Sequence, residues 1–187
     1  REAKLNKKLN HFLENKKIYL RAPKNEDINS GYLNWLNDPD VNQFLETRYR
    51  YQSHRDIEEF IENQRNSDNS NLFAICTKNN NVHIGNIKIG PINRLHGNAD
   101  ISYLIGEKKY WGKGYGSSAV KLILKFGFLV LNLRKITAGC YSDNIGSAKL
   151  LLKCGFKKEA TLKKQWICNG KYNDEYIFSI FKENYTK

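Results

Sequence analysis

Tyr110-Trp111-Gly112-Lys113-Gly114-Tyr115-Gly116-Ser117 places three alternating glycines between a strand pattern and a long apolar helix pattern. Glycine has no side chain, so the backbone N–H groups of such a loop can approach a ligand closely. The N-terminus of the following helix adds unpaired N–H donors and a partial positive charge. This combination is typical of a site for an anion such as a pyrophosphate. The structural alternative is a tight strand-to-helix turn that binds nothing.

The loop differs from two common nucleotide-binding loops. It lacks the Gly-Lys-Ser/Thr ending of an ATP-binding loop, and it lacks the glycine spacing and the later acidic residue of a dinucleotide fold. Lys108, Lys109 and Lys113 add positive charge nearby. The sequence therefore favours an anionic ligand of another class.

Outward from the loop, the patterns of apolar and polar residues predict one α/β domain around a mixed sheet. The predicted strands cover residues 18–21, 72–77, 82–89, 100–105, 136–141, 156–167 and 172–181. The predicted helices cover residues 25–37, 39–45, 53–66, 114–131 and 143–153. We find no repeat or linker, so residues 18–187 are expected to form a single domain. Residues 1–17, with Leu5, Leu9 and Leu13 at helical spacing, are expected to be an N-terminal extension.

The charge of the chain is strongly segregated. The formal net charge is +12, which suggests an anionic partner such as nucleic acid, a membrane surface or a phosphate-bearing ligand. Residues 26–68 nevertheless hold ten of the 19 acidic residues and only four basic ones. This acidic lobe has a net charge of −6, which leaves +18 for the rest of the chain. An enzyme with one anionic and one cationic substrate could use both regions, and solvated helix faces are the alternative.

The four cysteines show no sign of a metal site or a disulfide framework. Cys76, Cys140, Cys154 and Cys168 form no C-x-x-C pair and stand at no metal-ligand spacing from a histidine. Each lies in or beside an apolar run, where a free cysteine behaves as a small hydrophobe. No apolar run is long enough to span a membrane, and no secretory signal is visible. We therefore expect a reduced, cytoplasmic protein with no metal and no membrane partner.

A second motif follows downstream, Asn144-Ile145-Gly146-Ser147 and then Lys153-Cys154-Gly155-Phe156. With the glycine loop, it resembles the GNAT acetyltransferases, whose acetyl-CoA loop reads [QR]-x-x-G-x-[GA] and whose later segment reads N-x-x-S…K-x-G-F. Trp111 replaces the usual Gln or Arg, a form common in the branch of ribosomal-protein alanine and small-amine acetyltransferases. The resemblance covers roughly residues 18–181. It implies a GNAT fold, with a mixed sheet of about seven strands flanked by helices and splayed between the fourth and fifth strands.

The resemblance also implies acetyl-CoA as cosubstrate, with its pantetheine arm lying in the splayed gap like an extra strand. The backbone of Tyr103, Leu104 and Ile105 would pair with this arm, and an N–H of the same strand would face the thioester oxygen. Asn144 would contact the cosubstrate from the other side. The residues expected to contact it at the loop are Trp111, Gly112, Lys113, Gly114, Tyr115, Gly116 and Ser117.

Two residues are candidates for proton transfer. A Lys-like amine has a pKa near 10, so having its free base at pH 7 costs roughly 4 kcal/mol, and a general base helps. Asp100 falls, counting back from the glycine loop, where the histone acetyltransferase branch carries its catalytic Glu. Ser147 matches a serine given the role of acid to the leaving thiolate in the ribosomal branch. Other amine acetyltransferases use a tyrosine four residues later, which here is Leu151.

The acceptor is expected to meet the acidic lobe. Trp35, Glu46 and Arg48 lie on segments that cover the acceptor side in this fold, and Asp174 is similar to a recurring family residue near the acceptor cleft. The resemblance thus predicts transfer of an acetyl group directly to a primary amine. A protein N-terminus, an amino sugar and a small amine such as a polyamine all remain open, as does a homodimer.

Two other functions compete with the enzyme. A basic nucleic-acid-binding module would explain the net charge of +12 and the 11 tyrosines, but not the acidic lobe or the paired motifs, so no DNA partner is expected. A GNAT-fold regulator that binds CoA without turnover would keep the intact glycine loop. The sequence favours the enzyme, and a thiol-release assay separates the three.

Overall fold

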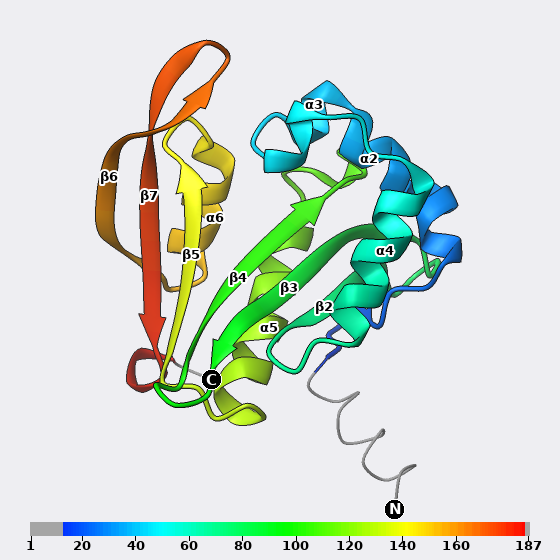
Figure 1. Cartoon of the computed structure of the whole chain (residues 1–187). Helices are drawn as coiled ribbons and strands as arrows, with labels where there is room; N and C mark the ends of the chain where they lie inside the picture. The colour runs from blue at the N-terminus through cyan, green and yellow to red at the C-terminus, as the bar shows by residue number, and fades with distance from the viewer. Residues whose placement is uncertain (1–12, 186–187) are drawn as a thin grey trace, which may run out of the picture.

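Seven strands form one mixed sheet in a computed structural model that describes residues 13–185 (Figure 1). The strand order is β1-β2-β3-β4-β5-β7-β6, and every neighbouring pair is antiparallel except β4 and β5. The strands are β1 (Ile18–Arg21), β2 (Asn71–Thr77), β3 (His83–Asn93), β4 (Asn98–Ile105), β5 (Lys135–Tyr141), β6 (Lys157–Cys168) and β7 (Lys171–Phe181). This confirms the predicted mixed sheet of about seven strands.

Helices cover both faces of the sheet. The α-helices are α2 (Leu33–Asn37), α3 (Pro39–Asn42), α4 (His54–Arg65), α5 (Tyr115–Leu129) and α6 (Ile145–Lys153). A π-helix, η1 (Ile28–Tyr32), precedes α2, and short 3-10 turns are η2 (Glu46–Tyr49), η3 (Lys108–Tyr110) and η4 (Lys182–Asn184). In Figure 1, α4 lies in front of β2 and β3, and α5 crosses behind the same half of the sheet. The helix α6 lies behind β5.

Local sequence explains most of these boundaries. The helix α4 begins with a capping box, because the Ser53 side chain accepts from the Asp56 N–H and the Asp56 carboxylate accepts from the Ser53 N–H. The helix α5 buries most of its side chains because it is apolar on more than one face and is covered by the sheet. The single helix predicted over residues 25–37 is instead divided between η1 and α2, with a kink at Gly31.

Two buried clusters hold the fold together. The main core lies between the sheet and the helices α5 and α6, and it includes Ile75, Ile123, Phe128 and Phe178. The second core lies under the acidic lobe, and it includes Trp35, Ile57 and Ile61. Hydrophobic burial of this extent is the main stabilising contribution to the folded domain.

The strands β4 and β5 separate after only three paired positions. They pair at Asn98 with Lys135, Ala99 with Ile136, and Asp100 with Thr137. Both strands continue, β4 to Ile105 and β5 to Tyr141, but diverge in a wedge that Figure 1 shows between their arrowheads. The predicted splay between the fourth and fifth strands is therefore confirmed.

The other sequence predictions concern membrane-spanning segments, the cysteines and the N-terminal residues. Among residues 13–185, no helix is both long enough and apolar enough to cross a membrane. All four cysteines are free and buried. The boundary between an N-terminal extension and the domain stays a prediction, and the helical spacing of Leu5 and Leu9 lies outside the described residues.

Candidate active site

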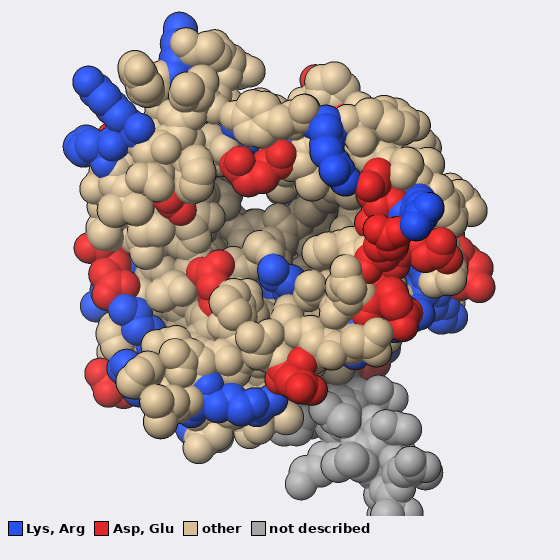
Figure 2. Space-filling model, viewed as in Figure 1, with Lys and Arg blue, Asp and Glu red and all other residues tan. Residues whose placement is uncertain are grey.

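A cleft of about 890 Å³ occupies the wedge between β4 and β5. Its walls come from β4, the glycine loop, the end of β5, the start of α6, the segment 40–46 and the β6–β7 hairpin. Figure 2 shows an opening at this place, with acidic side chains on its rim. Segments far apart in the sequence therefore meet at one cavity because the sheet splits there.

The glycine loop forms the start of α5. Gly112 and Gly114 have φ angles of 69° and 79°, which favour glycine, and Gly114 is the N-cap of α5. No described atom lies within 4 Å of a Cβ built at Gly112, so the loop surface is open there. The first N–H groups of α5 have no intrahelical acceptor. An open glycine surface at a helix N-terminus fits the pyrophosphate of acetyl-CoA.

Gly116 and Trp111 of the glycine loop make contacts that hold the loop in place. A Cβ on Gly116 would lie 2.7 Å from a Leu150 side-chain carbon, so this glycine permits close packing of α5 against α6. The Trp111 indole donates a hydrogen bond of 2.6 Å to the Ile105 carbonyl and ties the loop to the end of β4. Tyr115 and Ser117 also line the cleft.

The β4 edge that faces the wedge has no paired strand beyond Asp100. Tyr103, Leu104 and Ile105 all line the cleft, and their other edge pairs with β3. Backbone groups on such an edge can bind an extended chain as another strand would. The Ile105 carbonyl is the exception, because Trp111 occupies it.

Ser147 lies in the first turn of α6 and faces β4 across the wedge. The Asn144 side chain caps this helix by accepting from the Ser147 N–H at 3.1 Å. The Ser147 hydroxyl lies 2.7 Å from the Tyr103 hydroxyl. Burial raises the pKa of Tyr103, so its hydroxyl stays protonated at neutral pH. Leu151, four residues after Ser147, is fully buried.

Cys140 also lines the cleft, but its chemistry does not suit a nucleophile. Burial raises the pKa of its thiol to about 11, so little thiolate exists at neutral pH. The expectation that Cys140 is a core residue fits its buried position.

Asp100 occupies the last paired position of β4, at the base of the wedge. The Thr137 hydroxyl donates to its carboxylate at 2.9 Å. The pKa of Asp100 is raised to about 6, chiefly by burial; the negative charge of Glu175 acts in the same direction, whereas Thr137 and Lys88 act in the opposite direction. A pKa near 6 suits a general base at neutral pH. Asp100 does not itself line the cleft.

The acceptor end of the cleft holds two carboxylates and a group of aromatic rings. Glu46 accepts a short hydrogen bond from the Tyr141 hydroxyl. Glu175 accepts from the Trp166 indole N–H at 3.0 Å. A Cβ on Gly139 would lie only 2.6 Å from a Glu175 carboxylate oxygen. The missing side chain at Gly139 therefore lets the Glu175 carboxylate reach over β5 into the wedge.

The sequence resemblance points to Asp174, whereas the side chain that lines the cleft belongs to the next residue, Glu175. Successive side chains of a strand face opposite sides of the sheet. Asp174 faces away from the cleft and binds Lys163 and the Lys164 N–H, each at 2.8 Å. Glu175 pairs in register with Tyr141, whose side chain also lines the cleft. Asp174 therefore does not line the cleft, whereas Glu175 does.

Trp35 and Arg48 also lie away from the expected acceptor contacts. Trp35 is buried in the second core and packs so tightly on Gly106 that a Cβ there would lie 1.9 Å from the indole. Arg48 donates to the Tyr141 hydroxyl at 2.9 Å and to the Ile167 carbonyl at 3.0 Å. It thereby joins η2 to the β6–β7 hairpin rather than facing the cavity.

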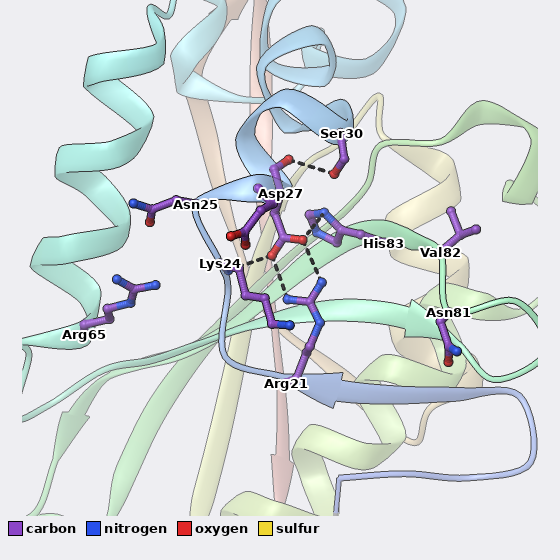
Figure 3. A pocket seen from close by; sticks show the side chains of 10 residues that line it. Arg21, Lys24, Asn25, Asp27, Ser30, Arg65, Asn81, Val82 and His83 are labelled. Carbon is purple, nitrogen blue, oxygen red and sulfur yellow. Dashed lines mark hydrogen bonds and ion pairs between the residues drawn. The ribbon is translucent and has the colours of Figure 1, made fainter.

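A second hollow, of about 940 Å³, lies beside β1 and η1. Figure 3 shows the Asp27 carboxylate between Arg21 and His83. Arg21 donates to both Asp27 oxygens at 2.6 and 2.7 Å, and the Lys24 N–H donates at 2.7 Å. Burial raises the pKa of Asp27, but these hydrogen bonds outweigh burial and hold it below its usual value. The Asp27 carboxylate is thus occupied by structural contacts, and the glycine loop is not part of this hollow.

Comparison with known proteins agrees with this geometry. A family model described as "Acetyltransferase (GNAT) domain" matches residues 17–157. The N-acetyltransferase p20 of Bacillus licheniformis is 32% identical over 176 residues, 93% of this chain and 98% of that protein. The spermidine N(1)-acetyltransferase of Vibrio cholerae is 27% identical over 135 residues, 72% of this chain and 77% of that protein.

Solved structures show the same architecture. A spermidine N-acetyltransferase from Vibrio cholerae, in complex with CoA and spermine, has a TM-score of 0.81 at 24% identity and covers 91% of this chain and 98% of its own. A GNAT-family acetyltransferase from Bacillus anthracis has a TM-score of 0.79 at 23% identity, with the same coverage. At these identities the likeness concerns the fold.

Proposed function

Since the chain belongs to the GNAT acetyltransferase family, and is thus an N-acetyltransferase with acetyl-CoA as cosubstrate, we propose that its acceptor is a primary amine on a small molecule with at least one further positive charge. A polyamine has this chemistry. The branch of ribosomal-protein alanine acetyltransferases, which the sequence also resembles, is not needed for this proposal.

The observation that carries the proposal is the Glu175 carboxylate in the acceptor end of the cleft. Asp40, another cleft carboxylate, is neutralised by Lys108 at 2.5 Å. Glu46 lies 3.7 Å from Arg48 and is partly compensated. Among residues 13–185, no cationic side chain forms an ion pair with Glu175. A half-buried carboxylate without a cation favours a positively charged ligand.

The aromatic rings around Glu175 support the same acceptor class. Tyr141 lies between Phe44 and Trp166, with ring centroids 5.9 and 6.0 Å away. Aromatic faces attract organic cations. Relatives named spermidine N(1)-acetyltransferases, which include the Vibrio cholerae protein, add independent support. An anionic sugar nucleotide would instead meet repulsion at this end of the cleft.

The proposed mechanism uses the two ends of the wedge. Acetyl-CoA supplies the thioester, and the β4 backbone offers an N–H toward the developing oxyanion. The acceptor ammonium loses a proton through one water molecule to Asp100, which lies at the base of the wedge just outside the cleft lining. The acceptor nitrogen then attacks the thioester carbon. The C–S bond breaks as the C–N bond is completed. The attacking nitrogen still carries one excess proton. Ser147, held by the Tyr103 hydroxyl, gives its own proton to the departing thiolate and takes up the excess proton from the nitrogen.

A thiol-release assay with acetyl-CoA and a panel of amines tests the proposal. The panel contains spermidine, an amino-sugar nucleotide and a peptide with a free N-terminus. We expect the highest kcat/KM with spermidine. Preference for the sugar nucleotide or the peptide would refute the proposed acceptor class while leaving the N-acetyltransferase intact.

A further inference from the structure

Lys17 reaches the glycine loop from a distant part of the sequence. Its ammonium nitrogen lies 2.5 Å from the Lys113 carbonyl oxygen, 96 positions away. The same nitrogen lies 4.5 Å from the ring centroid of Tyr115, the first residue of α5. It is also 3.8 Å from a Cβ built on Gly114. A cation from outside the loop therefore stands at the mouth of the phosphate site.

The backbone at Lys17 is held on both sides. The Lys17 N–H donates to the Asn15 side-chain oxygen at 2.8 Å, and the Lys17 carbonyl accepts from the Lys78 N–H at 3.0 Å. The next residue, Ile18, is fully buried in the main core. The side chain therefore starts from a fixed point, which reduces the entropy lost when its ammonium binds a ligand.

A bound anion would improve the electrostatic surroundings of the Lys17 ammonium. The N-terminus of α5 carries a partial positive charge, so a cation beside it is repelled. Lys113 adds another positive charge to the same loop. The Lys113 carbonyl satisfies one of the three ammonium N–H donors of Lys17. An anionic group bound at the loop would turn this repulsion into attraction.

We propose that Lys17 is a binding residue for acetyl-CoA, whose ammonium forms a charge-assisted hydrogen bond with a phosphate group of the cosubstrate. The pyrophosphate and the 3′-phosphate share this chemistry. The inference concerns the cosubstrate and does not depend on which amine is the acceptor. It also gives a residue just before β1 a part in the site, whereas the sequence predicts only an N-terminal extension over residues 1–17 and leaves its role open.

Calorimetric binding of CoA and of 3′-dephospho-CoA tests the proposal without any acceptor. Lys17→Met keeps most of the aliphatic stem but removes the charge. We expect this variant to bind CoA about tenfold more weakly, because a hydrogen bond to a charged group contributes about 1.5 kcal/mol or more. Lys17→Arg should bind CoA within about threefold of the unmodified protein, since it keeps the charge.

Lys16→Met is the matched control, because it removes the same charge from the adjacent exposed residue. Weaker binding of both ligands by Lys17→Met would assign Lys17 to the pyrophosphate. Weaker binding of CoA alone would assign it to the 3′-phosphate. Equal CoA affinity in Lys17→Met and Lys16→Met would overturn the proposal. Equal losses in Lys17→Met and Lys17→Arg, with unchanged melting temperatures, would overturn it as well, because charge would then not matter.

Discussion

Asp174 and Glu175 are adjacent acidic residues on β7 with opposite surroundings. Asp174 binds Lys163 outside the cleft, whereas Glu175 faces the cavity through the space that Gly139 leaves. Their chemistry is nearly the same, so the direction of the side chain alone decides which of them meets a substrate. The pair offers a matched test of the acceptor site.

Glu175→Gln should raise the KM for spermidine by roughly tenfold, because the cationic acceptor loses a partly buried charge partner. The KM for acetyl-CoA should stay within about twofold, since Glu175 lies at the acceptor end. Steady-state kinetics with each substrate varied measure both effects. Asp174→Asn is the control and should change neither KM; equal effects of the two substitutions would contradict the assignment.

Replacement of Asp100 is expected to raise the stability of the protein and to lower its activity. Its pKa is raised from an ordinary value of 3.8 to about 6, chiefly by burial. The native state therefore binds this proton more tightly than the unfolded state, and native stability falls as the pH rises through 6. This difference in pKa corresponds to roughly 3 kcal/mol in the free energy of unfolding, before any relaxation of the native structure. Asp100→Asn should thus be more stable than the unmodified protein at pH 8, by about 2 kcal/mol, with a smaller difference at pH 5.

The same substitution should lower kcat/KM about 100-fold or more if Asp100 is the general base. The unmodified enzyme should show kcat/KM rising with pH up to about 6, and Asp100→Asn should lack this limb. Denaturant unfolding at both pH values and a pH–rate profile are the measurements. A variant that is stabilised yet fully active would show that Asp100 is only a buried acid.

Ser147 and Tyr103 are expected to act as one unit. Removing either hydroxyl breaks the same 2.7 Å contact, so Ser147→Ala and Tyr103→Phe should each lower kcat by roughly five- to tenfold, and the double variant by little more. Tyr110→Phe is the control, because this cleft tyrosine packs its ring against Tyr115 instead. Fully multiplicative effects in single-turnover experiments would argue against a shared proton donor.

At the scale of elements, the three glycines in the turn from β4 into α5 have different structural roles. Gly112 and Gly114 supply left-handed backbone and an open surface, whereas Gly116 permits the contact between α5 and α6. Substitutions at Gly112 and Gly114 should therefore impair ligand binding, whereas substitutions at Gly116 should disturb the packing of α5 against α6.

Gly114→Glu should abolish CoA binding, because it adds bulk and a negative charge at the anion site. Among the residues that the structure describes, and apart from the adjoining backbone, only the Lys17 ammonium lies within 4 Å of a Cβ at this position. The folded state should therefore survive apart from about 1 kcal/mol of backbone strain. Calorimetry and thermal unfolding measure the two effects. Gly114→Ala carries the strain without the charge, and it should retain measurable affinity. Unchanged CoA affinity in Gly114→Glu would exclude this loop as the phosphate site.

At the scale of the whole molecule, the sheet consists of two halves joined by three residue pairs between β4 and β5. The helix α5 covers the first half, and α6 covers the second. The wedge between the halves brings the glycine loop and the acidic lobe to one cavity. The net charge of +12 and the local acidic rim can therefore serve two substrates of opposite charge.

A cosubstrate that lies along the free edge of β4 should slow hydrogen exchange there. We expect backbone amides of residues 102–105 that face the wedge to gain protection when CoA binds, because they obtain hydrogen-bond partners and lose contact with water. The amides of residues 74–76 of β2, which pair with β1 on one side and β3 on the other, provide the internal control. Protection confined to the loop after β4 would contradict binding along the strand.

The sequence by itself determined the elements and the family. Periodic apolar residues, a capping pattern and glycines fix local structure through short-range sterics and burial, so the predicted strands and helices mostly end near their observed bounds. The alternating glycines and the Asn144–Ser147 segment also pointed to the cleft, because both are contiguous in the chain and both line it.

Only the tertiary structure decided the acceptor side. Whether Asp174 or Glu175 faces the cleft depends on the register of β7 against β5, which local sequence does not encode. The burial of Trp35, the role of Arg48 as a tie and the approach of Lys17 to the loop likewise depend on contacts between distant segments. Such contacts exist only after the sheet has formed and split, because the long-range packing then sets which side chains share one cavity.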